Sequence, residues 1–121
     1  MRVFDASALL AFLRGESGGS VVHEYLREAG CFSAANWAEV AQKLPQLGIS
    51  WAQGRGALLS FDLTVEPVTI DDAEAAAALW SKGSGLSLAD RLCLALGNRL
   101  GADIITCDTA WAGQPGVELV R

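Results

Sequence analysis

Lysine and histidine are scarce in this sequence of 121 residues. Lysine occurs only at Lys43 and Lys82, His23 is the only histidine, and fourteen acids against nine bases leave a net charge of -5. This balance disfavours a broad basic face that clamps phosphate backbones, and His23, with no second histidine, is not assigned to catalysis. Contact with nucleic acid would need help, which bound divalent cations could supply because they reverse the apparent charge of a site.

Cysteine pairs and long apolar runs are missing as well. The three cysteines, Cys31, Cys93 and Cys107, lack CxxC spacing, and each lies in an apolar run where a thiol packs as a small hydrophobic group. We therefore expect a reducing, cytoplasmic location. No apolar run approaches the ~20 residues that cross a bilayer, and no basic and apolar leader precedes Arg2, so we expect no membrane association.

The length and composition allow a hydrophobic core without disulfides or a structural metal, so we expect residues 1–121 to form a single domain. The sequence is 51% apolar with a mean hydropathy of +0.29, which excludes disorder and is slightly apolar for a monomer. We expect part of the surface to contact a partner. Trp51, Trp80 and Trp111 lie at helix or turn positions where an aromatic side chain usually packs, and we expect them in the core.

Segments typical of strands and of helices alternate along the whole chain. Five short β-prone runs are bounded by turns, at 2–4, 31–34, 63–65, 104–107 and 117–120. Helical patterns fill the intervals, at 6–13, 20–29, 36–44, 50–61, 71–81 and 88–100. Pro67 confines the third strand to a sheet edge. The alternation predicts an α/β fold with a parallel sheet covered by helices on both faces.

Two aspartates, Asp5 and Asp108, come directly after predicted strands. Ligands of open parallel sheets bind beyond the carboxyl ends of the strands, so both carboxylates point to one crevice. Each also has an ordinary structural explanation, because Asp5 can cap the helix that follows and Asp108 can shape a turn. Thr106 shares a strand face with Asp108, and its hydroxyl, like that of Ser7, could orient a carboxylate or a water.

Asp90 lies in the last predicted helix, on a row of side chains that continues through Cys93 and Leu94. A carboxylate on an apolar row needs a partner or a cation, because unpaired burial is costly. The alternative is a capping box, since Ser87 precedes Asp90 by three residues. The two roles are compatible.

Glu39 has the weakest local signal of the candidate acids. The apolar stripe of its helix consists of Trp37, Val40, Ala41 and Leu44. This stripe places Glu39 on the opposite face, together with Asn36 and Lys43. An ion pair between Glu39 and Lys43, four residues later, is the ordinary explanation.

Four segments, spread in order over nearly the whole chain, form a specific pattern. They are VFDASALL at 3–10, NWAEV at 36–40, LSLADR at 86–91 and ITCDTAW at 105–111. Together they resemble the motifs of PIN-domain nucleases, and within that family most of all those of VapC toxins. Each motif alone is loose, but their order and spacing make the resemblance specific.

The resemblance implies a three-layer α/β/α sandwich with a central parallel sheet of about five strands. It implies a site for Mg²⁺ or Mn²⁺, ions that prefer oxygen ligands, held by four acids: Asp5, Glu39, Asp90 and Asp108. The implied reaction is metal-assisted hydrolysis of RNA without a side-chain nucleophile. A homodimer and a cognate antitoxin that blocks the site are implied as partners. Candidates for holding the RNA strand are Arg14, Lys43 and Arg91.

Two other functions fit parts of the pattern. A catalytically degenerate domain of the same fold, which only binds partners, would have lost a carboxylate, and all four acids are present. A receiver-like phosphoacceptor domain also gathers acids at strand ends. Receivers need a lysine after a late strand, however, and none follows Thr106 or Val120.

Overall fold

Five parallel strands form one sheet at the centre of the structure, a computed structural model that describes all of residues 1–121. The strands are β1 (Arg2–Phe4), β2 (Gly30–Ser33), β3 (Leu63–Glu66), β4 (Asp103–Thr106) and β5 (Val117–Leu119). Their order across the sheet is β3-β2-β1-β4-β5. The central β1 pairs through Val3 with Cys31 of β2 and with Ile104 of β4. The predicted strands are confirmed, and β3 lies at an edge as Pro67 indicated.

Six helices connect the strands. They are α1 (Ala6–Arg14), α2 (Gly19–Leu26), α3 (Ala34–Gln46), α4 (Trp51–Leu59), α5 (Ile70–Ala78) and α6 (Leu88–Leu100), and a 3₁₀ turn, η1 (Thr109–Trp111), follows β4. Hydroxyl side chains begin four of the helices by accepting a backbone hydrogen bond, at Ser33, Ser50, Thr69 and Ser87. Gly15 and Gly101 end α1 and α6 in the left-handed conformation that glycine adopts without strain.

Side chains of the central strands alternate between two separate hydrophobic clusters. On one face, Phe4 and Ile105 are fully buried against residues of α1, α2, α3 and α4. On the other face, Val3 and Ile104 are buried against α6 and Trp111. Because successive strand residues point to opposite faces, this alternation places helices on both sides of the sheet. The fold is the predicted three-layer α/β/α sandwich.

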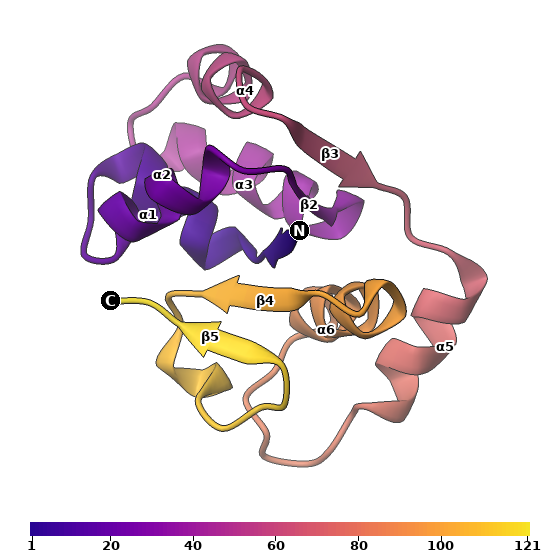
Figure 1. Ribbon diagram of the computed structural model, residues 1–121. Coiled ribbons are helices and arrows are strands. Elements are labelled where there is room, and N and C mark those ends of the chain that lie inside the picture. The colour runs from indigo at the N-terminus through magenta and orange to yellow at the C-terminus, as the bar shows by residue number, and fades with distance from the viewer.

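Helix α5 is attached to the rest of the molecule through α6. Figure 1 shows α5 and α6 together at the lower right, whereas α1 to α4 gather in the upper part of the view. Arg99 of α6 binds both carboxylate oxygens of the buried Asp72 at 2.8 and 3.1 Å, and Arg91 donates to the carbonyl of Ala76 at 2.8 Å. Such bidentate, charge-assisted contacts fix orientation as well as distance. They fix α6, and with it Asp90, relative to α5.

Two details of the predicted core are wrong. Trp80 is 62% exposed, because α5 ends at Ala78 and not near residue 81, which leaves Trp80 in the turn that follows. Asn36 is fully buried, although periodicity placed it on the polar face of its helix. The expectation is correct for Trp111, which is fully buried, and Trp51 packs edge-to-face on Trp37 with ring centroids 4.9 Å apart.

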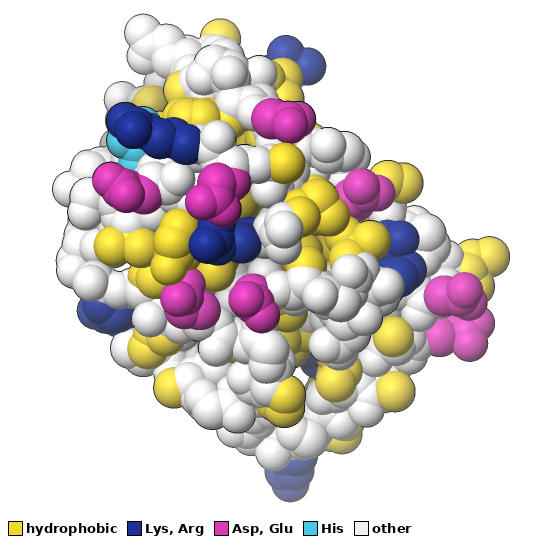
Figure 2. Space-filling view, viewed as in Figure 1, with side chains coloured by type: hydrophobic (Ala, Val, Ile, Leu, Met, Phe, Trp, Pro, Cys, Tyr) yellow, Lys and Arg dark blue, Asp and Glu magenta, His cyan; other side chains and the backbone are white.

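The surface agrees with the mixed charge of the sequence. In the face drawn in Figure 2, acidic and basic side chains are interspersed among hydrophobic ones, and no extended basic area is visible. None of the helices is both long enough and apolar enough to span a membrane. All three cysteines are free thiols, with Cys31 and Cys93 buried and Cys107 partly buried.

Candidate active site

Asp5 lies at the carboxyl end of the central strand β1 and is only 3% exposed. Its carboxylate caps α1, because Oδ1 accepts a hydrogen bond from the backbone N–H of Ala8 at 2.8 Å. Thr106 Oγ1 donates to Oδ2 at 2.6 Å, and Ser7 Oγ lies 2.8 and 2.9 Å from the two oxygens. Because each hydroxyl has one proton, the carboxylate accepts three hydrogen bonds and keeps one free position.

The same two hydroxyls attach the end of β4 to Asp5. Ser7 Oγ accepts from the backbone N–H of Cys107 at 2.9 Å, and Thr106 Oγ1 accepts from the backbone N–H of Asp108 at 3.0 Å. The end of β4, which precedes Asp108, is therefore held next to the end of β1, which precedes Asp5. Its own carboxylate is partly exposed and begins η1 by accepting from the N–H of Ala110 at 3.0 Å.

Asp90 lies in the first turn of α6 and is half-buried. It forms the predicted capping box with Ser87: the N–H of Asp90 donates to Ser87 Oγ at 3.1 Å, and the N–H of Ser87 donates to Asp90 Oδ2 at 2.9 Å. Only one oxygen of the carboxylate is used in this way. The cap therefore leaves the other oxygen, Oδ1, available for a further partner.

Glu39 lies in α3 with its side chain 25% exposed. Asn36 Nδ2 donates to Glu39 Oε1 at 2.8 Å, and Lys43 Nζ is 3.6 Å from Oε2, so the ion pair expected from the sequence is present. The Oδ1 atom of Asn36 is buried and has no hydrogen-bond partner. Sequence periodicity missed this contact, because it treated Asn36 as a solvent-facing residue.

Burial and, to a smaller extent, mutual repulsion raise the pKa values of two of the acids. Burial raises the pKa of Asp5 to about 6, against the hydrogen bonds from Thr106, Ala8 and Ser7, and the charge of Asp90 raises it further. Burial also raises the pKa of Asp90 above its usual range, and the charges of Glu39 and Asp108 add to that rise. Asp90 thus interacts with each of the other three acids.

The four acids differ in how their charge is compensated. Glu39 has an ion pair, whereas Asp5, Asp90 and Asp108 have no cationic partner within 4.0 Å. As the side chains lie, no three acidic, histidine or cysteine groups converge on one point that could hold a metal ion. Their oxygen atoms are nevertheless the ligands that hard divalent cations prefer, and the uncompensated charge is what such a cation neutralises.

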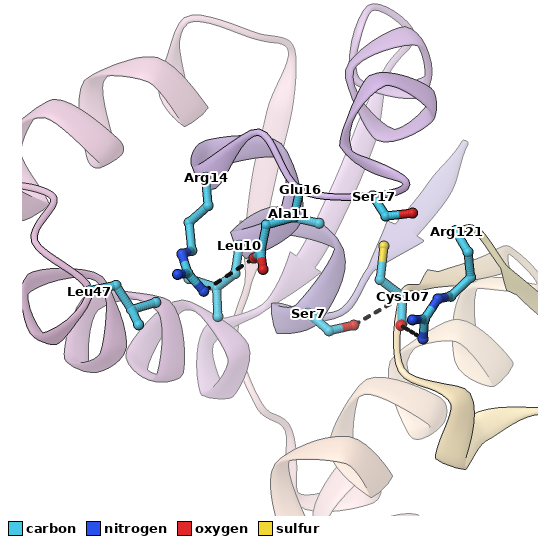
Figure 3. Close-up of a pocket in the computed structure, with 9 residues that line it drawn as sticks. All are labelled: Ser7, Leu10, Ala11, Arg14, Glu16, Ser17, Leu47, Cys107 and Arg121. Atoms are coloured by element: carbon cyan, nitrogen blue, oxygen red, sulfur yellow. Dashed lines mark hydrogen bonds and ion pairs between the residues drawn. The ribbon is translucent and has the colours of Figure 1, made fainter.

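A pocket of about 300 Å³ is lined by Ser7, whose hydroxyl is bound to Asp5. Figure 3 shows Ser7 and Cys107 between two arginines, Arg14 on one side and Arg121 on the other. Arg14 Nη1 lies 3.3 Å from Glu16 Oε1, and Arg121 Nη1 donates to the carbonyl of Cys107 at 3.4 Å. The pocket therefore brings positive charge close to the acids.

Residues 2–115 match the sequence model of the PIN domain. The chain belongs to the PIN domain family. The PIN fold accounts for the five-stranded parallel sheet and its six helices. No curated protein matches the chain in sequence.

Solved structures share this PIN fold over almost the whole chain. A toxin-antitoxin complex from Klebsiella pneumoniae is 24% identical with a TM-score of 0.80, covering 98% of this chain and 96% of that one. VapC20 from Mycobacterium tuberculosis, described as a sarcin-ricin loop cleaving toxin, is 18% identical with a TM-score of 0.78, covering both chains completely. VapBC2 from Rickettsia felis, bound to a DNA fragment from their promoter, is 14% identical with a TM-score of 0.71, covering 99% and 98%. At these identities the likeness establishes the fold.

The basic residues around the PIN site differ from the expected set. Arg91 Nη1 is bound to the carbonyl of Ala76, and Lys43 is paired with Glu39, so both have structural partners. Arg14 lines the pocket beside Asp5. Arg121 lines it as well and was missed, because nothing in the sequence distinguishes it except its position after the last strand.

The raised pKa of Asp5 leads to a test of stability against pH. Between the ordinary pKa of 3.8 and the folded value of about 6, Asp5 is protonated in the folded state and ionised in the unfolded state. Protonation of Asp5 therefore contributes to the free energy of unfolding in full below pH 3.8, and this contribution is lost as the pH rises through 6. The difference corresponds to about 3 kcal/mol. In EDTA, the free energy of unfolding of the wild type relative to Asp5→Asn should fall by about this amount between pH 4 and pH 7.

Urea denaturation at several pH values provides the measurement. The difference between the two free energies of unfolding removes the effect of all other titrating groups. Any pH-independent loss of stability in Asp5→Asn shifts this difference by the same amount at every pH. A difference that stays constant over this pH range would mean that Asp5 is ionised throughout and that its burial is compensated.

Proposed function

We propose that this PIN-domain protein is a ribonuclease that hydrolyses RNA phosphodiesters with Mg²⁺ or Mn²⁺. The proposal rests on the buried Asp5, whose pKa is raised to about 6 and which lies near Asp90, a second acid without a cationic partner. Leaving such a group uncompensated costs free energy, and residues of this kind concentrate at functional sites. PIN nucleases generally use divalent metal ions, which agrees with this charge.

The metal would be held by Asp5, Glu39, Asp90 and Asp108. When bound, a divalent ion lowers the pKa of a water and neutralises charge that develops on the phosphate oxygens. The supporting roles follow from hydrogen bonds: Ser7 and Thr106 donate to Asp5, and Asn36 donates to Glu39. These donors hold the carboxylates in the ionised, oriented state that a ligand requires.

A side-chain nucleophile is disfavoured at this site. Burial raises the pKa of the Cys93 thiol well above its usual range and that of Cys107 as well, and the charge of Asp5 raises both further. Both cysteines are therefore protonated and weakly nucleophilic at neutral pH. The Ser7 and Thr106 hydroxyls donate to Asp5 and accept from the backbone N–H groups of Cys107 and Asp108, so both are engaged at the strand ends, and Thr106 is fully buried. This supports attack by water.

We further propose that the protein is a toxin controlled by a cognate antitoxin. The support is the family together with two neighbouring structures, described as a toxin-antitoxin complex and as VapBC2 on promoter DNA. A cytoplasmic location, a homodimer and a single domain over residues 1–121 complete this proposal. Membership of the PIN family rules out the receiver-like alternative. A degenerate PIN domain that only binds partners can be distinguished from a ribonuclease only by measuring RNA cleavage.

Cleavage of RNA should require a divalent ion and each of the aspartates. Asp5→Asn, Asp90→Asn and Asp108→Asn each remove one charged ligand, so we expect rate losses of roughly a hundredfold or more. Glu39→Gln should also be severely impaired. The measurement is the cleavage rate of labelled RNA with Mg²⁺, with Mn²⁺ and with EDTA.

Ser87→Ala provides the matched control for Asp90. It removes the hydroxyl that accepts from the N–H of Asp90, and it keeps the Asp90 carboxylate, which still accepts from the backbone N–H of residue 87. It should therefore cost about 1 kcal/mol of stability and leave the cleavage rate nearly unchanged. Full activity in EDTA would contradict the metal mechanism. If Ser87→Ala lost as much activity as Asp90→Asn, Asp90 would act as a helix cap and not as a ligand.

The toxin role makes a separate prediction about growth. Production of the wild-type chain in a bacterial host should arrest growth, because cleavage of cellular RNA stops translation, whereas Asp108→Asn should be harmless. Growth curves after induction, with protein levels matched by immunoblot, provide the measurement. Harmless production of an active wild-type enzyme would exclude the toxin role and leave the ribonuclease proposal intact.

A further inference from the structure

The pocket beside Asp5 contains groups that the proposed hydrolysis does not use. Arg14 comes from the end of α1, and Arg121 follows β5, so two guanidinium groups reach one pocket from opposite ends of the sequence (Figure 3). The two side chains lie on opposite sides of the pocket. Each guanidinium is a planar fork of N–H donors, which suits phosphate because phosphate accepts paired hydrogen bonds.

The pocket is connected directly to the acidic site. Ser7 lines the pocket and its hydroxyl is 2.8 Å from Asp5 Oδ1, while Cys107, also in the lining, is the residue before Asp108. A group bound in the pocket would therefore lie next to the carboxylates. Neighbouring phosphates of a nucleic acid strand are only a few bonds apart, so a strand cleaved at Asp5 must place its next nucleotide close by.

The charge and shape of the pocket favour a phosphodiester over a free cation or an apolar ligand. Arg14 and Arg121 against Glu16 give the lining a net charge of about +1, and the Ser17 hydroxyl adds a donor. The carboxylate of Glu16 is 3.3 Å from Arg14 and competes with an incoming anion for that guanidinium. The remaining wall is apolar, formed by Leu10, Ala11 and Leu47.

We propose that this pocket is the subsite for the nucleotide next to the scissile phosphate of single-stranded RNA, with Arg14 and Arg121 binding its phosphate and Leu10 and Leu47 contacting its base or sugar. Apolar contact without base-edge donors makes this subsite tolerant of sequence. Glu16 limits the affinity by holding Arg14. The inference rests on the proposed ribonuclease function and adds the residues that hold the strand.

The experiment measures binding of a fluorescent single-stranded RNA by anisotropy, with Mg²⁺ present and in the Asp108→Asn background to prevent cleavage. Arg14→Gln and Arg121→Gln should each weaken binding by roughly fivefold and reduce the slope of log affinity against log salt by about 0.7. Glu16→Gln should have the opposite effect, tightening binding by roughly twofold to fivefold, because it removes a negative charge and frees Arg14.

Arg27→Gln is the matched control, since Arg27 is an exposed arginine at the C-terminal end of α2 and does not line the pocket. It should bind RNA like the parent protein. Equal losses for Arg27, Arg14 and Arg121 would indicate only general charge attraction and would overturn the proposal. The proposal would also be overturned if the pocket variants bound RNA normally but lost binding of another ligand. Lost binding of a polyglutamate peptide would assign the pocket to an acidic protein, and lost binding of inorganic phosphate would assign it to free phosphate.

Failure of the function and failure of this inference are distinguishable. If the wild type cleaves RNA with metal but Arg14→Gln and Arg121→Gln bind normally, the ribonuclease proposal stands and the subsite is wrong. If the wild type neither cleaves nor binds RNA, both are wrong. The tightening expected for Glu16→Gln cannot be produced by misfolding, which keeps the test independent of stability losses.

Discussion

The burial of one carboxylate, that of Asp5, constrains the rest of the site. Asp5 ends the central strand, begins α1 and is kept from water, so its charge must be stabilised by the residues around it. Three donors do so, and they come from two places: Ser7 and Ala8 in α1, and Thr106 at the end of β4. This carboxylate therefore connects the ends of β1 and β4 with the start of α1. Removing one of the three donors would disturb the position of the other two.

The structure reduces, but does not remove, the cost of gathering several acids. Asp5 and Asp90 lie at or near the N-termini of α1 and α6, where the helix dipole and unpaired N–H groups favour negative charge. Asp108 caps the 3₁₀ turn η1 in the same way. The same residues are thus helix caps and site acids at once. Burial, and to a smaller extent the neighbouring acids, still raises the pKa of Asp5 and of Asp90, and a divalent cation would oppose that rise.

Much of the fold and the acidic set could be predicted from the sequence. Strands and helices alternate with clear turn signals, so the parallel sheet and the edge position of β3 followed from local patterns. Local patterns gave the structural contacts of Asp5, Asp90 and Glu39 correctly, but they could not bring these residues together, and the family motifs were needed to single out Glu39. Its contact with Asn36 depends on how α3 packs, and the burial of Asn36 reverses what periodicity indicated.

The pocket was beyond local patterns for a similar reason. Arg14 and Arg121 are 107 residues apart in the sequence. They line the same pocket only because β5 pairs with β4, which places the residues after β5 near α1. The exposure of Trp80 depends on where α5 ends, and such boundaries are the least certain part of any sequence pattern. Tertiary packing, which a single sequence expresses weakly, decides both features.

If Asp5, Glu39, Asp90 and Asp108 together form a divalent cation site, the metal-free protein should bind Mn²⁺ at pH 7, above the pKa of Asp5. Calorimetric titration measures this binding. We expect the wild type and Asp71→Asn, a change at an exposed aspartate on α5, to bind Mn²⁺ alike, and Asp5→Asn and Asp90→Asn to bind it roughly 10-fold to 100-fold more weakly. Equal Mn²⁺ binding by all four proteins, or none by the wild type, would exclude a cation site formed by these acids.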